Sequence, residues 1–200
     1  MIRRTFVGLQ RRYSYLNRIS DGLLQRRSES FYKMINKYIT QRDKILDIGV
    51  GSCHITHLLK ENGYNVTPLD VQNLSQFKNI APTIFDGRRI PFSASSFDTC
   101  LILAVLHHID NPEEMIKEAK RVSRKIVIIE DVYENTLEKY KTYFFDSLVN
   151  FEFFGHPHTN KKDNEWKSVF RKLGLKLIDS RRDSVWGFKL ATYCLETGEM

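Results

Sequence analysis

The chain has 200 residues, of which 42% are hydrophobic and 28% are charged. This size and balance are typical of a soluble globular protein with one domain. No apolar run reaches the roughly 18–20 residues that a membrane span needs, and we expect no secretory signal because an apolar h-region is missing. The three cysteines, Cys53, Cys100 and Cys194, lie too far apart for a zinc site or a disulfide framework. We therefore expect a reducing, cytoplasmic location.

The net charge of +7 is concentrated near the N-terminus. Residues 1–27 hold seven of the 31 basic side chains and one of the 24 acidic ones, so the rest is close to neutral. The basicity thus belongs to an arm, and a nucleic-acid groove across the domain is not expected. The first 20 residues contain no acid, which fits a mitochondrial targeting segment or a basic lead-in helix. We expect this arm and an amphipathic helix over 1–40, followed by one domain over 41–200.

Hydrophobic periodicity predicts the elements of the first half in chain order. The prediction is a helix over 20–39, a strand over 44–48, a helix ending near Gly63, and strands over 65–70, 83–85 and 99–106. In the next helix Asn111 can be the N-cap, Pro112 suits the first position and Glu114 completes a capping box. The second half then gives a strand over 125–129, helices near 134–150 and 161–173, and strands over 175–179 and 189–195.

Strands that alternate with helices and end in a strand pair predict an α/β fold. We expect a doubly wound, seven-stranded Rossmann-like sheet, mostly parallel with an antiparallel C-terminal pair, and helices on both faces. In such sheets ligands bind at the carboxyl ends of the strands, where the strand order reverses.

A glycine turn at the end of the first predicted strand is the first candidate for a ligand site. Asp47, Gly49 and Gly51 open the following helix, and glycines let the backbone approach a ligand closely. Asp70 ends the next strand about twenty residues later, where a carboxylate can accept both ribose hydroxyls of a nucleoside. A dinucleotide site would place a third glycine at His54, which is too bulky for close helix–strand packing. A phosphate-free nucleoside therefore fits better.

At this point residues 42–131 resemble the class I S-adenosylmethionine-dependent methyltransferases, in particular the small-molecule, methyltransferase domain type 11-like branch. The matching segments are Ile45–Gly51, Leu69–Asp70, Phe85–Gly87, Ile90–Phe92, Ser96–Asp98 and Val105–Ile109. The resemblance implies S-adenosylmethionine as cofactor. It implies contacts to that cofactor from Asp47, Gly49, Gly51, Asp70, Val71, Asp86, Gly87, Leu103 and His107. Cys53 departs from the family, which usually has a small residue such as a third glycine there.

By this resemblance, Gly49 and Gly51 face the methionine part, Asp70 the ribose, and Asp86 with the Gly87 amide the adenine. Backbone near Leu103 and the His107 side chain border the methionine end. The residues alone leave Asp86–Gly87 open to a second interpretation, an ordinary Asp-Gly turn. Asp98 begins a strand on the far side from the ligand and is expected to be structural.

A methyltransferase needs a general base only when its acceptor keeps a proton near neutral pH. Histidine is the natural candidate, because its ordinary pKa of about 6.5 lies close to working pH. His108, after the fourth predicted strand, and His156, in a turn-rich segment, are the candidate catalytic residues. The alternatives are packing beside the cofactor for the His107–His108 pair and a plain surface loop for His156. No metal is expected, since carboxylates or cysteines at ligand spacing are missing.

Seven aromatic rings between 140 and 154 favour a small apolar or aromatic methyl acceptor. A protein or RNA methyltransferase is the alternative, although the Asn/Asp-Pro-Pro-Tyr/Phe motif of amine-methylating enzymes is absent after the fourth strand. A second alternative is an inactive cofactor-binding protein that serves in an assembly. A nicotinamide oxidoreductase is disfavoured by His54 and by the lack of a Tyr-x-x-x-Lys pair. The expected activity is methyl transfer to a small molecule, with nucleic acid an unlikely partner.

Overall fold

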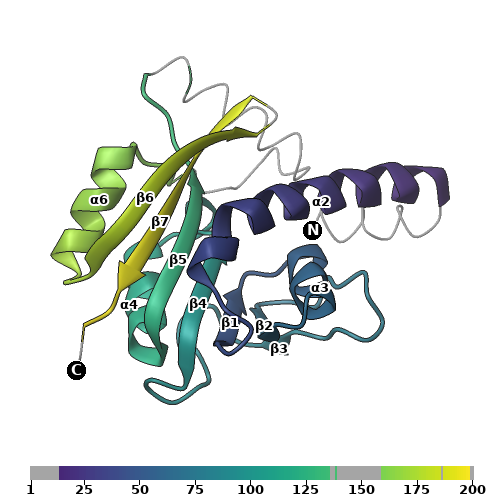
Figure 1. Ribbon diagram of the computed structural model, residues 1–200, viewed down its shortest axis with the longest axis horizontal. Helices are drawn as coiled ribbons and strands as arrows, with labels where there is room; N and C mark the ends of the chain where they lie inside the picture. The colour runs from purple at the N-terminus through teal and green to yellow at the C-terminus, as the bar shows by residue number, and fades with distance from the viewer. Residues whose placement is uncertain (1–13, 136–137, 139–158, 186, 199–200) are drawn as a thin grey trace.

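The computed structural model describes residues 14–135, 138, 159–185 and 187–198 (Figure 1). Its centre is a seven-stranded sheet in the order β3-β2-β1-β4-β5-β7-β6. The strands are β1 (Lys44–Ile48), β2 (Asn65–Asp70), β3 (Thr83–Ile84), β4 (Phe97–Leu103), β5 (Ser123–Asp131), β6 (Lys176–Val185) and β7 (Phe188–Glu196). Neighbours among β1 to β5 pair in parallel, and β7 runs antiparallel to both β5 and β6. The predicted fold class is confirmed.

Helices cover both faces of the sheet. They are α2 (Ser14–Ile35), α3 (His54–Glu61), α4 (Pro112–Val122) and α6 (Asp163–Lys172), with short 3-10 turns η1 (Asn36–Tyr38) and η2 (Leu106–His108). One core cluster packs α4 and α6 on the sheet through Ile116 and Trp166, and the other packs α2 and α3 through Ile35 and Leu59. Figure 1 shows these two pairs on opposite sides of the sheet. Helix α2 thus shares a core cluster with the sheet. The division of the chain at residue 40 stays a prediction.

The start of α4 corrects one local prediction. Pro112 occupies its first turn as expected, but the Asn111 side chain makes no capping hydrogen bond. The Glu114 amide donates instead to the Asn111 carbonyl at 3.2 Å, and the Glu114 carboxylate pairs with Lys117 at 2.7 Å. The capping-box prediction is therefore wrong, because backbone and surface partners take the groups that the box would use.

Two strand boundaries differ from the sequence prediction for identifiable reasons. β4 ends at Leu103, three residues early, because Ala104 adopts a left-handed φ of 57° that a strand cannot continue. β6 runs ten residues to Val185 and forms the edge of the sheet. Most of its side chains are exposed, so it lacks the apolar alternation by which a strand is found. The predicted helix over 134–150 falls mostly outside the described residues.

The strand order reverses between the parallel strands β1 and β4: from β1 the sheet continues through β2 and β3 to one edge, and from β4 it continues through β5 toward the other. Ile48 lies beside Leu69 of β2 on one side and Ile102 of β4 on the other. The loops that follow these strands therefore meet at one edge, where a doubly wound sheet binds its ligand. Across the described part of the chain, no helix has the length and apolarity to span a membrane.

Candidate nucleoside-binding site

The turn between β1 and α3 has a left-handed backbone at every second residue. Gly49, Gly51 and Cys53 have φ values of 74°, 50° and 64°. A Cβ on Gly49 would lie 2.7 Å from both methyl groups of Val105, whereas a Cβ on Gly51 would meet nothing within 4 Å. Gly49 thus permits contact with the loop after β4, and Gly51 faces open space. The left-handed φ at Cys53 explains why a glycine suits that position in similar sequences.

Asp70 fastens the end of β2 to this turn. Its Oδ2 accepts a hydrogen bond from the Gly51 amide at 2.8 Å, and Oδ1 accepts from the amides of Val71 and Gln72 at 2.7 and 3.3 Å. The side chain is buried at the carboxyl end of β2. A carboxylate has about four acceptor positions, so three backbone bonds leave capacity for a hydroxyl group of a ligand.

Asp47 supports the glycine turn from behind. Its side chain is 1% exposed and accepts a 2.6 Å hydrogen bond from the Thr56 hydroxyl in α3. Burial raises the pKa of Asp47 to about 6, the Thr56 bond opposes the rise, and nearby Asp70 adds to it. The side chain therefore holds β1 against α3, and its direct contact with a cofactor stays a prediction.

Val71 and the turn after β3 form a second wall. Val71 is 54% exposed, and a Cβ on Gly87 (φ 78°) would lie 3.2 Å from its Cγ1. The Asp86 Oδ1 accepts hydrogen bonds from the amides of Arg88 and Arg89 at 2.9 and 3.1 Å, and these bonds lower the Asp86 pKa. The Asp-Gly turn is thus present, and an additional adenine contact stays a prediction. An exposed apolar side chain beside backbone amides suits one face of a heteroaromatic ring.

The loop after β4 is held by a buried acid that sequence reasoning missed. Glu130 of β5 accepts hydrogen bonds from the amides of Val105 and Leu106 at 2.9 and 2.7 Å through Oε1. Its Oε2 lies 2.6 Å from Nδ1 of His107, and both side chains are fully buried. The available signal was an acid directly after four apolar residues of a central strand, because such a position requires polar partners.

The histidines divide between this loop and α3. The rings of His107 and His108 lie 4.0 Å apart at 42°, so the structure brings this pair to the carboxyl end of β4. His156 lies outside the described residues, and both catalytic assignments stay predictions. His54 and His57 pack against Phe77, with centroid distances of 5.0 and 4.1 Å, in agreement with a structural role. Asp98 accepts from the Lys44 amide at 2.9 Å, also as expected for a structural residue.

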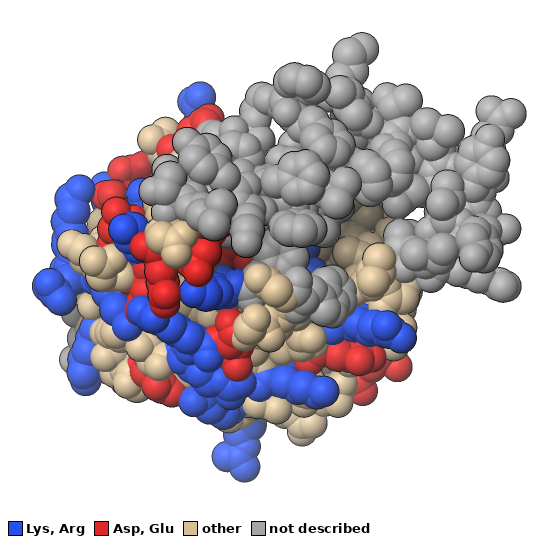
Figure 2. All heavy atoms as spheres, turned by 90° about the horizontal axis from the view of Figure 1, so that it is seen from above, with Lys and Arg blue, Asp and Glu red and all other residues tan. Residues whose placement is uncertain are grey.

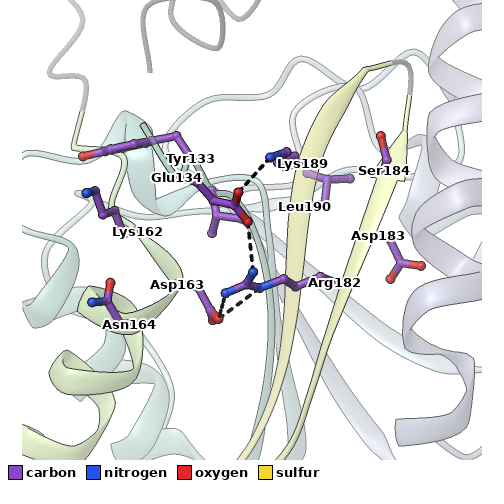
Figure 3. Close-up of a pocket in the computed structure, with 11 residues that line it drawn as sticks. Tyr133, Glu134, Lys162, Asp163, Asn164, Arg182, Asp183, Ser184, Lys189 and Leu190 are labelled. Carbon is purple, nitrogen blue, oxygen red and sulfur yellow. Dashed lines mark hydrogen bonds and ion pairs between the residues drawn. The ribbon is translucent and has the colours of Figure 1, made fainter. Parts of the chain in front are cut away.

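A cavity of about 490 Å³ lies at the carboxyl end of β5 (Figure 3). The described residues of its wall are Val132, Tyr133, Glu134, Lys162, Asp163, Asn164, Arg182, Asp183, Ser184, Lys189 and Leu190. Arg182 bridges Asp163 at 2.6 Å and Glu134 at 3.1 Å across the opening. The wall begins one residue after Asp131, whose carboxylate lies 3.9 Å from Nε2 of His107. None of the described wall residues is a predicted cofactor contact, and the cavity has the size of a small-molecule site.

The doubly wound sheet with this strand order belongs to the Rossmann-like fold class. Residues 46–129 match the family model described as "Methyltransferase domain". The uncharacterized protein MJ1123 of Methanocaldococcus jannaschii is 31% identical over 110 residues, which are 49% of this chain and 53% of that protein. The matched region thus spans about half the length of this curated relative.

Solved methyltransferase structures share the fold. A SAM-dependent methyltransferase from Methanosarcina mazei has a TM-score of 0.64 at 20% identity, over 82% of this chain and 97% of that one. The magnesium protoporphyrin IX methyltransferase of Synechocystis PCC 6803, solved with bound SAH, has a TM-score of 0.60 at 14% identity, over 86% and 83%. The domain match over residues 46–129 and the shared fold support a class I S-adenosylmethionine-dependent methyltransferase with S-adenosylmethionine as its cofactor.

Proposed function

We propose that this chain transfers a methyl group from S-adenosylmethionine to a small-molecule acceptor. The observation that carries the proposal is the bond between Asp70 and the Gly51 amide, beside the open space that Gly51 faces. This arrangement offers a ribose acceptor and a close backbone approach at one point of the crevice. It is the combination that a nucleoside without phosphates requires.

The proposed cofactor contacts follow the crevice from one end to the other. Gly49, Gly51 and the Leu103 backbone would hold the methionine part, and His107 would border its end. Asp70 would bind the ribose, and Asp47 would brace the turn. Val71 would cover one face of the adenine, with Asp86 and the Gly87 amide at its edge. S-adenosylmethionine supplies an activated methyl group, so the residues of the chain need only to bind the cofactor, align the acceptor with it and exclude water.

We place the acceptor at the cavity beyond β5. The aromatic residues between 140 and 154, which lie outside the described residues, support an apolar or aromatic body for it. The described wall adds charged and amide groups such as Lys162 and Asn164, which can bind a polar substituent (Figure 3). His108 or His156 would act as the base for an acceptor that must lose a proton.

Two alternatives remain open to experiment. In the described part of the face shown in Figure 2, basic and acidic side chains are interspersed, which disfavours a track for RNA. An inactive cofactor-binding protein would keep the crevice but lack an acceptor. Binding of S-adenosylmethionine without turnover of apolar, aromatic and amine acceptors would favour that second reading.

Titration calorimetry with S-adenosylmethionine, S-adenosylhomocysteine and NADH tests the proposal. We expect both adenosyl ligands to bind, and Asp70→Ala to weaken their binding by about 1.5–3 kcal/mol through lost charge-assisted hydrogen bonds. Glu196→Ala is the matched control, because Glu196 is an exposed acid paired with Lys176 at the far end of β7. Micromolar binding of NADH without binding of either adenosyl ligand would refute the assignment.

A further inference from the structure

Glu130 is a fully buried acid with no place in the cofactor contacts proposed above. It lies near the carboxyl end of β5, next to β4 in the sheet. Its Oε1 accepts hydrogen bonds from the amides of Val105 and Leu106, and its Oε2 lies 2.6 Å from Nδ1 of His107. A buried acid is costly to leave unpaired, and this one has three partners within a single turn.

Those three partners carry the wall of the crevice. The turn starts at Ala104, whose left-handed φ of 57° costs free energy and needs support from its surroundings. The Ala104 amide donates to the Ile129 carbonyl at 2.7 Å, so the turn is attached to β5 at Ile129 as well as at Glu130. The same turn presents Val105 to Gly49, where no room remains for a Cβ. Glu130 therefore determines how closely the β4 loop approaches the glycine turn.

The bonds of Glu130 also orient the His107 ring. An ionised carboxylate can only accept hydrogen bonds, so an ionised Glu130 requires Nδ1 of His107 to carry the proton of the bond to Oε2. The other ring nitrogen, Nε2, is then directed toward Asp131, whose Oδ2 lies 3.9 Å away. The ring of His108 lies 4.0 Å away and is tilted by 42° against it. A carboxylate that fixes the tautomer of a histidine is a recurring way to prepare that ring for a functional role.

We infer that Glu130 is a positioning residue: it clamps the turn over 104–107 against the glycine turn and fixes the protonated nitrogen of His107. The inference rests on the proposed function for its consequence, which is a preformed methionine end of the cofactor site. It does not require Glu130 to touch the cofactor or the acceptor. Its action passes through Val105 and His107.

Glu130→Gln separates the two tasks. The amide oxygen of glutamine can accept the hydrogen bonds from the Val105 and Leu106 amides. If the NH2 group took that place instead, the two buried backbone N–H groups would face another donor and lose their acceptor. The NH2 group must then face His107, so Nδ1 becomes an acceptor and the proton moves to Nε2. Nitrogen-15 NMR of the labelled imidazoles reports which nitrogen is protonated. We expect Nδ1 to be protonated in the wild type and in the control Glu196→Gln, and unprotonated in Glu130→Gln.

Affinity for S-adenosylhomocysteine tests the clamp. We expect Glu130→Gln to bind it within about threefold of the wild type, because the turn keeps its acceptor, and Glu130→Ala to bind at least about tenfold more weakly. An unchanged affinity in Glu130→Ala, or equal losses in both variants, would overturn the clamp. If Glu130→Ala does not fold, Glu130→Gln still decides: a loss of more than tenfold in its affinity contradicts the inference.

The two proposals fail in different ways. If the wild type binds no adenosyl ligand, the proposed function is refuted, while the NMR comparison still tests the assignment of Glu130. If the wild type binds S-adenosylhomocysteine but Nδ1 of His107 stays protonated in Glu130→Gln, the inference about Glu130 is refuted and the proposed function stands. A shift of the proton with wild-type-like cofactor affinity supports both.

Discussion

Substitution of Gly49 by alanine gives the sharpest test of the contact between the β1 and β4 loops. The new Cβ would lie 2.7 Å from Cγ1 and Cγ2 of Val105, well inside van der Waals contact. Alanine at a φ of 74° adds about 1–2 kcal/mol of left-handed backbone strain, and overpacking adds about 1–3 kcal/mol. We expect Gly49→Ala to lower the free energy of unfolding by about 2–5 kcal/mol, measured by urea denaturation.

Gly51→Ala is the matched control, because it shares the left-handed φ but has open space around its Cβ. We expect Gly51→Ala to lower the free energy of unfolding by the backbone strain alone, about 1–2 kcal/mol. We also expect it to bind S-adenosylhomocysteine more weakly. Val105→Ala in the Gly49→Ala background should recover part of the lost stability, since the two sites are in contact. Equal destabilisation by the two glycine variants, with no recovery from Val105→Ala, would show that the loops do not meet as described.

Three further predictions concern single side chains. Burial raises the pKa of Asp47 to about 6, so the folded state favours the protonated side chain. Its contribution to the free energy of unfolding is complete below the unfolded pKa near 4 and is lost as the pH rises through 6. Asp47→Asn should therefore gain about 2–2.5 kcal/mol relative to the wild type between pH 4 and 7.5 in denaturant titrations; a constant difference would contradict this. Asp163→Ala should destabilise the fold by about 3–5 kcal/mol, because this buried acid accepts from Arg182, Lys167 and the Tyr193 hydroxyl; a loss below about 1 kcal/mol in thermal unfolding would argue against its role. Val71→Ala should weaken S-adenosylhomocysteine binding about fivefold and leave stability within about 0.5 kcal/mol, as its side chain is 54% exposed; calorimetry that shows unchanged affinity would remove Val71 from the site.

Local patterns were sufficient for the central strands and the start of the site. The predicted bounds of β1 and β2 agree with the structure, because short apolar runs bordered by a glycine or an acid report a strand that is buried on both faces. Pro112 likewise marked the first turn of α4. The edge strand β6 could not be bounded this way, since its exposed faces impose no periodicity on its side chains.

Side-chain partners were beyond the reach of such patterns. Asn111 occupies the N-cap position of α4 as predicted, yet its side chain makes no capping hydrogen bond. Asp86 could be assigned to a turn or to an adenine contact, and the structure shows the turn bonds to Arg88 and Arg89. Residue type sets what a group can bind, and the surrounding fold selects among the available partners.

By itself, the sequence determined that a parallel sheet would place a glycine turn and Asp70 at the ends of adjacent strands. It did so because burial periodicity and turn chemistry are local properties of the chain. Only the tertiary structure decided that Glu130 binds His107 and that Val105 leaves no room beside Gly49. Parallel strands are joined by crossovers, so such contacts link residues far apart in the chain and depend on strand order and register. The glycine turn therefore indicated which cofactor to expect, and the buried acid behind the next loop emerged only from the folded sheet.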